Sequence, residues 1–326
     1  MGRKAKVLLT AALVAAAALL ASEPLLAAKR GAPVLPPLTS PATNVRQAGR
    51  VVWHDLLTPD LAVDERFYGA LFGWTYRDMH SGRHTYVVAF ADGVPVAGLL
   101  ERPLPRDGGR RPQWLGFIST DDVDAAMHAA LEHGARDVSK PHDYPQRGRQ
   151  AVLQDPQGVA FGMISSTTGD PPDWLAEPGQ WIWSALFTHD AENEAAFYQD
   201  VFGYDVYDLD DSSDDATTGS GAVVHLELAS HDYARASINS LPDAQARRSR
   251  WVQFVRVESA WSAAAKAQAL GARVVLAPRV DRQGGHIALL ADPSGALFGV
   301  MDWPDSDEGS AAGPAPPSVG PHGGPP

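Results

Sequence analysis

The chain has 326 residues, enough for two ordinary domains, and its hydrophobic content of 44% is that of a globular protein. Its formal net charge of -12 argues against nucleic acid as a partner, because phosphate binding requires a basic surface. The absence of cysteine excludes disulfides, thiolate metal sites and cysteine nucleophiles, and it leaves the redox compartment undecided.

A short apolar run at the start of the chain predicts export. Arg3, Lys4 and Lys6 precede the apolar residues 7–21, and small residues follow, which is the layout of a secretory signal peptide. The run is short for a membrane span, although an uncleaved anchor is the alternative. We expect a signal peptide over residues 1–28 and an exported protein, periplasmic or secreted, that contacts no membrane after cleavage of this leader.

Composition divides the rest of the chain into linkers and domains. Residues 29–48 are rich in proline and are predicted to be a linker, and a second linker is expected over 166–178. From residue 304 to 326 the chain consists mainly of Asp, Gly, Ala and Pro, which predicts a disordered tail. Two domains remain, over 49–165 and 179–303.

The first domain contains two units of a strand, a helix and further strands. Apolar side chains at helical spacing predict a helix over 61–72, ended by Gly73, and a second helix over 123–133, ended by Gly134. Strands are expected at residues 53–60 (running into a turn), 85–90, 94–100, 114–122, 150–154 and 159–164.

The second domain repeats the first. The strand that carries Trp53 returns with Trp183, 130 residues later, and Phe-Tyr and Phe-Gly pairs follow both at the same spacing. The Asp-Pro-x-Gly turn that begins at Asp155 returns at Asp292, 137 residues later. The chain is therefore two copies of one domain, and a site built by the fold should occur twice.

This repeated pattern resembles the vicinal oxygen chelate superfamily, which includes glyoxalase I, extradiol dioxygenases and the bleomycin-resistance proteins. The resemblance covers residues 49–165 and 179–303. It implies an α+β fold of two tandem domains, each of paired βαβββ modules that form a cupped mixed β-sheet with helices outside. It does not imply a reaction, because the superfamily contains isomerases, dioxygenases, transferases and binding proteins.

The resemblance also implies where a metal would bind. In metal-using members the ligands come from the first and last strands of the modules. The matching positions in the two copies here are Trp53, Trp114 and Gly162, and Trp183, Trp251 and Gly299. Indole has no lone pair to give and glycine has no side chain, so the usual site lacks the donors a metal requires. We expect neither a metal nor a cofactor.

The tryptophans suggest a different use for each cup. Because strand side chains alternate, Asp55 faces the first cup if Trp53 does, and His54 then faces the helices. We expect two indoles in each cup, a flat lining suited to planar or aromatic ligands, with Asp55 as a lone acid at the edge of the first. The predicted ligand-binding residues are Trp53, Asp55, Trp114, Trp183 and Trp251. The alternative is that these tryptophans only fill the space.

Two polar groups are further candidates. His225 and Glu227 lie two apart on one strand and could hold a relocated metal, with His286 as a third ligand, but an ordinary surface pair is the expected reading. The run Arg147-Gly148-Arg149 could contact an anionic ligand, but we expect a solvent-exposed turn.

The sequence thus predicts an exported protein that lacks the usual metal ligands and binds a small apolar or aromatic molecule. The alternative is a metal-dependent lyase, isomerase or dioxygenase with a relocated metal site, and a third hypothesis is a degenerate module with filled cups. The expected partner is a small-molecule ligand, with no nucleic acid, and a homodimer is left open.

Overall fold

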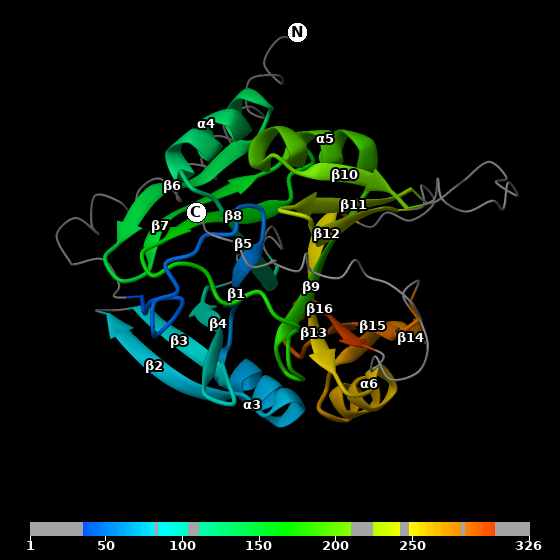
Figure 1. Ribbon diagram of the computed structural model, residues 1–326. Coiled ribbons are helices and arrows are strands. Elements are labelled where there is room, and N and C mark those ends of the chain that lie inside the picture. The colour runs from blue at the N-terminus through cyan, green and yellow to red at the C-terminus, as the bar shows by residue number, and fades with distance from the viewer. Residues whose placement is uncertain are drawn as a thin grey trace, which may run out of the picture.

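The computed structural model describes residues 35–81, 84–103, 111–209, 224–241, 248–281 and 284–303. The expected signal peptide and tail lie outside these ranges. The described residues form two eight-stranded sheets with two helices each (Figure 1). None of the helices in these ranges has the length and apolar character needed to cross a membrane.

Sheet 1 contains all strands of the first domain in the order β2-β3-β4-β1-β5-β8-β7-β6. The strands are β1 (Val51–Thr58), β2 (Thr75–Ser81), β3 (His84–Ala91), β4 (Val94–Glu101), β5 (Gln113–Ser119), β6 (Arg136–Tyr144), β7 (Gly148–Gln154) and β8 (Ala160–Ser166). The pairs β1–β4 and β5–β8 are parallel and close two βαβββ modules, which β1 and β5 join as antiparallel neighbours. The predicted fold is confirmed.

Sheet 2 repeats this arrangement in the order β10-β11-β12-β9-β13-β16-β15-β14. Its strands are β9 (Trp181–Thr188), β10 (Asp205–Asp208), β11 (His225–Ser230), β12 (Tyr233–Ser240), β13 (Arg250–Val257), β14 (Arg273–Val280), β15 (His286–Ala291) and β16 (Leu297–Asp302). Each sheet thus pairs two modules that are consecutive in the chain.

The four helices begin at side chains that cap them. They are α3 (Leu61–Phe72), α4 (Val123–Glu132), α5 (Ala191–Phe202) and α6 (Ala260–Ala269). Asp60 and Asp190 accept hydrogen bonds from backbone N–H groups in the first turns of α3 and α5, and Asp122 and Ser259 do so for α4 and α6. Each such cap contributes about 1 kcal/mol.

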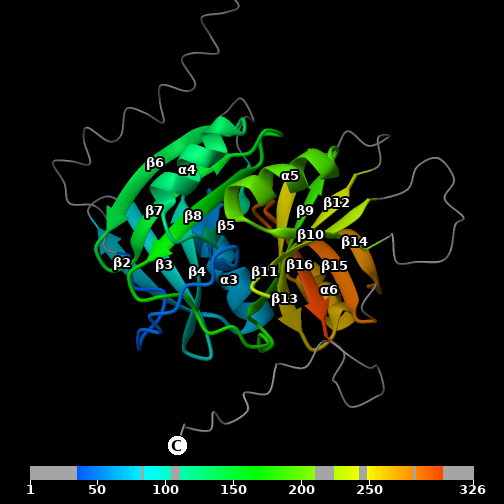
Figure 2. The ribbon, with the colours of Figure 1, turned by 45° about the horizontal axis from the view of Figure 1, so that its top comes forward.

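The convex faces of the two sheets pack against each other through these helices. Helix α4 lies beside α5 (Figure 2), and α3 contacts α6. Both large apolar clusters combine side chains of the two domains, one around α3 and α6 and the other around α4 and α5. Each helix therefore lies outside the cups on the face of its sheet that meets the other domain, with one side still exposed, as at Trp261 of α6. The two concave faces point away from the domain interface.

Candidate functional site

We call the concave face of sheet 1 cup 1 and that of sheet 2 cup 2. Trp53 on β1 faces cup 1, as predicted, and His54 faces the domain interface. The Trp53 indole N–H lies 2.8 Å from Asp55 Oδ1 and 3.0 Å from the Tyr86 hydroxyl, which itself donates to Asp55 at 2.8 Å. Gly98 is needed beside them, because a Cβ there would overlap Tyr86 and Asp55. Asp55 is buried within this network, and burial raises its pKa.

Cup 1 is covered by part of the segment predicted to be a linker. We call residues 35–38 the strap. Leu35 and Leu38 of the strap pack in one buried cluster with Trp53, which is 2% exposed. The Arg147 guanidinium lies 4.0 Å from the centre of the Trp53 ring, and its Nε donates to the Pro36 carbonyl at 2.6 Å. The proline-rich composition of this segment gives no sign of these contacts.

The turn before β7 directs one arginine inward and one outward. Arg147 is fully buried, so the expectation of a solvent-exposed turn is wrong for this residue. Arg149 lies at the surface and pairs with the exposed Asp124 at 2.6 Å. Gly148 has a φ of 121° and packs so tightly on β8 that a Cβ would overlap the Ser165 carbonyl. The neighbouring Arg147 side chain lies in cup 1, where it contacts Trp53 and Pro36.

Cup 2 carries different side chains at the same positions. Trp183 is only partly buried, and its indole N–H donates to Ser237 Oγ at 3.1 Å. Ser237 pairs with Ala185 as Gly98 pairs with Asp55 in cup 1, so cup 2 has a hydroxyl where cup 1 has a carboxylate network. The apolar cluster around Trp183 consists of side chains of sheet 2 and of Trp303, and most of its members are only partly buried.

A polar edge borders this apolar surface. His225 and Glu227 share one face of β11, as their spacing predicts, and this face is that of cup 2 because Leu226 and Leu228 pack on the helix side. His225 Nδ1 is hydrogen-bonded to Asn239 Oδ1 on β12. Burial raises the pKa of Glu227.

His286 does not join this pair, so a three-residue site with it is wrong. It lies on the opposite face of sheet 2, beside Trp261 of α6, and contacts Asp302 at 3.2 Å. In the described parts of the chain no three His, Cys, Asp or Glu side chains gather closely enough to hold a metal.

The two other predicted tryptophans lie outside the cups. Trp114 and Trp251 face the domain interface, where their indole N–H groups donate to Tyr68 and Tyr198, each at 2.8 Å. The expectation of two indoles in each cup is therefore wrong. Phe117 is the residue of β5 that lies beside Trp53 on the neighbouring strand and in the same apolar cluster. Trp114, three residues away, lies on the other face because side chains alternate.

The last-strand positions leave no room for a metal ligand. Gly162 and Gly299 lie against the rings of Phe117 and Phe254, and a Cβ at either glycine would overlap the ring. Any carboxylate there would displace an aromatic side chain. The residues present in the two cups therefore do not fit the metal site that the fold family uses.

A hydrogen-bonded relay at the interface escaped the sequence analysis. Tyr68 donates to Asp292 of the other domain at 2.8 Å, and Tyr198 donates to Asp155 at 3.1 Å. The signal was present in the repeated Phe-Tyr pair and Asp-Pro-x-Gly turn, but their meeting requires the packed domains.

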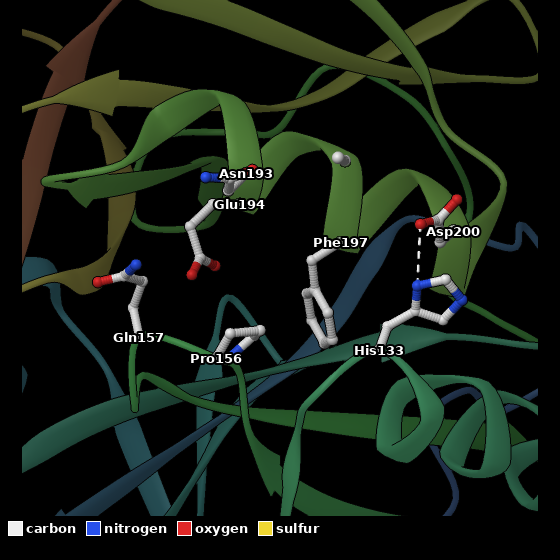
Figure 3. A pocket seen from close by; sticks show the side chains of 8 residues that line it. His133, Pro156, Gln157, Asn193, Glu194, Phe197 and Asp200 are labelled. Carbon is white, nitrogen blue, oxygen red and sulfur yellow. Dashed lines mark ion pairs between the residues drawn. The ribbon is translucent and has the colours of Figure 1, made fainter.

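A hollow of about 290 Å³ opens at this interface between α5 and the turn after β7 (Figure 3). Glu194 points toward Pro156 and Gln157 there, and the His133 ring lies 3.0 Å from Asp200. Glu194 is 1% exposed and lies near Asp155. Burial and then the charge of Asp155 raise its pKa to about 9.

The fold and the two cups define a protein of two tandem domains, each made of paired βαβββ modules. Residues 50–163 match the family described as the Glyoxalase/Bleomycin resistance protein/Dioxygenase superfamily, and residues 183–301 match the Glyoxalase-like domain. The chain belongs to this superfamily, which confirms the resemblance.

The chain matches two curated relatives over nearly their whole length. The "Putative glyoxylase CFP32" of Mycobacterium tuberculosis is 30% identical over 263 residues, covering 80% of this chain and 97% of that protein. The "Anthracycline biosynthesis protein DauV" of Streptomyces sp. (strain C5) is 28% identical over 277 residues, covering 81% and 97%.

Solved structures share the fold at lower identity. The Mn(II)-bound glyoxalase from Novosphingobium aromaticivorans aligns with a TM-score of 0.53 at 16% identity, covering 79% of this chain and 83% of that one. The 2,3-dioxygenase LapB from Pseudomonas sp. KL28 aligns with a TM-score of 0.52 at 13% identity, covering 82% and 97%.

Proposed function

We propose that this protein binds a small planar, apolar or aromatic molecule in cup 2 without a metal ion. The observation that carries the proposal is the difference between the cups at equivalent positions. Trp53 is enclosed by the strap and Arg147, whereas Trp183 is partly exposed on an apolar surface that its own sheet provides. A flat indole face next to partly exposed apolar side chains suits a planar ligand.

The polar edge of cup 2 provides groups that can orient a bound ligand. The Ser237 hydroxyl accepts from the Trp183 indole N–H and from the Asn239 amide, and the Asn239 amide oxygen is hydrogen-bonded to His225. Such groups hydrogen-bond to carbonyl or hydroxyl substituents at the rim of an aromatic system and fix its position. The relative named for anthracycline biosynthesis supports a polycyclic aromatic of this kind as the ligand class, because anthracyclines are planar and carry carbonyl and hydroxyl groups.

Tryptophan fluorescence tests the proposal. We expect 1,4-dihydroxyanthraquinone to quench the emission of the purified full chain saturably, since energy transfer from Trp183 requires a bound acceptor. Trp183→Leu should weaken binding by about tenfold or more, because an anchoring aromatic side chain is lost. Trp261→Leu is the matched control, because Trp261 is 57% exposed on α6 and should leave the affinity unchanged.

Two results would contradict the proposal. Unchanged emission across a broad panel of planar compounds would exclude such a site, and equal affinity of wild type and Trp183→Leu would exclude cup 2. Elemental analysis of protein purified without chelators tests the metal-dependent alternative. A stoichiometric transition metal would support that alternative.

A further inference from the structure

Arg147 in cup 1 has hydrogen-bonding capacity that the described residues do not use. The side chain is 0% exposed, and neither Nη1 nor Nη2 has a hydrogen-bond partner within the described ranges. A charged donor that is buried without a partner costs free energy, because water no longer solvates it. The guanidinium carbon lies 4.0 Å from the centre of the Trp53 ring, and Nε donates to the Pro36 carbonyl at 2.6 Å, so two contacts hold the group in place.

The nearby acid does not fill this edge. Asp55 Oδ1 accepts from Trp53 and Tyr86, and no hydrogen bond joins Asp55 to Arg147 among the bonds of the described residues. The Nη groups therefore remain open to a different acceptor.

The strap occupies cup 1 in the manner of a ligand. The Pro36 carbonyl accepts from Arg147 Nε at 2.6 Å, and Leu35 and Leu38 pack in the cluster that contains Trp53. One acceptor oxygen thus lies on the guanidinium next to an apolar body. A carboxylate would make a better partner than a single neutral carbonyl, because its two oxygens match two parallel N–H donors of arginine.

We propose that cup 1 is a second binding site, for a small aromatic or branched carboxylic acid. The carboxylate binds the guanidinium of Arg147, and the apolar part takes the place of Leu35 and Leu38. The strap competes for the same space and covers the site when no acid is bound. Cup 2 has Gly284 at the position equivalent to Arg147, so the preference for an acid belongs to cup 1.

The test uses 4-fluorobenzoate and its neutral isostere 4-fluorobenzamide, observed by fluorine NMR with the full chain. Leu38→Ala weakens the packing of the strap in cup 1. The strap then covers the site for less of the time, and the apparent affinity for the acid rises. We expect this variant to bind 4-fluorobenzoate about tenfold more tightly than wild type. It should prefer the benzoate over the benzamide by about tenfold, because the amide carries no charge. Leu175→Ala, at an exposed leucine, is the control for the strap and should leave the affinity at the wild-type value.

Arg147→Met in the Leu38→Ala background should abolish the benzoate preference, whereas Arg149→Met in that background should retain it. If circular dichroism shows that Arg147→Met is unfolded, the ratio of benzoate to benzamide affinity in Leu38→Ala decides whether the proposal holds. A ratio near one, no gain in affinity in Leu38→Ala, or retained preference in a folded Arg147→Met variant would overturn the proposal. Repeating the titration with Trp183→Leu distinguishes the two sites. This variant should lose binding in cup 2 but bind 4-fluorobenzoate in cup 1 as before.

Discussion

The Tyr68 hydroxyl of the first domain donates to the Asp292 carboxylate of the second at 2.8 Å, and it accepts from Trp114 at the same distance. All three side chains are buried, and burial raises the pKa of Asp292 to about 7. Trp251, Tyr198 and Asp155 repeat this relay in the opposite direction. Trp114 and Trp251, which were expected to line the cups, thus serve to join the domains.

Tyr68→Phe should destabilise the protein by about 1–3 kcal/mol, because it leaves the Asp292 carboxyl and the Trp114 N–H buried without their partner. Urea unfolding at pH 7 measures this change. Tyr207→Phe, at a tyrosine that is 54% exposed, should change the stability by less than about 0.5 kcal/mol. Equal stability of Tyr68→Phe and wild type would show that the relay does not hold the domains together.

The raised pKa of Glu194 predicts that stability falls as pH rises. The folded state holds the proton up to a pH of about 9, whereas an unperturbed Glu releases it above its usual pKa of 4.5. Unfolding therefore releases a proton between these values, and the stability of the folded state decreases with rising pH across this window. Glu194→Gln removes this titration and should be more stable than wild type by about 1–3 kcal/mol at pH 9.

Urea unfolding at pH 5, 7 and 9 measures the effect of Glu194→Gln. Glu192→Gln, at an exposed position of the same helix, should keep the wild-type pH dependence. An equally steep decline in stability with pH in Glu194→Gln would mean that another group carries the dependence.

Gly162→Ala should destabilise the first domain by about 1–3 kcal/mol, because the added Cβ forces the Phe117 ring to move. The double variant Gly162→Ala/Phe117→Leu should be destabilised by less than the sum of the two single variants, because the smaller side chain leaves room for the added Cβ. Thermal unfolding of the four proteins measures the coupling. Strict additivity would show that the ring and the glycine do not restrict each other.

We propose that the protein is exported and that its leader is cleaved. Residues 1–28 should therefore be absent from the mature protein, and N-terminal sequencing of material from the periplasm or medium should begin near Lys29. A double Lys4→Glu/Lys6→Glu variant should slow export, because it removes positive charge that precedes the apolar run. Full-length protein confined to the cytoplasm would contradict the proposal.

The edge strands β2 and β6 were not predicted, and the pairing of strands into βαβββ modules was implied by the family resemblance. The sequence alone determined the repeat, the helices and the other strands of the first domain. Local signals suffice for these features: Asp60 and Asp190 cap helices, Gly73 and Gly203 end them in the left-handed region, and apolar spacing distinguishes helix from strand. Alternation also predicted that Trp53 and Asp55 share one face of β1 and that His54 lies on the other, as their hydrogen bonds show.

Tertiary structure decided what fills each cup. Trp114 and Trp251 occupy the helix side because the register of β5 on β8, and of β13 on β16, places Phe117 and Phe254 over the cup glycines. The burial of Arg147 depends on Gly148 against β8 and on the strap, which is far away in sequence. Side-chain alternation gives the two faces of a strand, but long-range packing decides which face meets solvent, ligand or another domain.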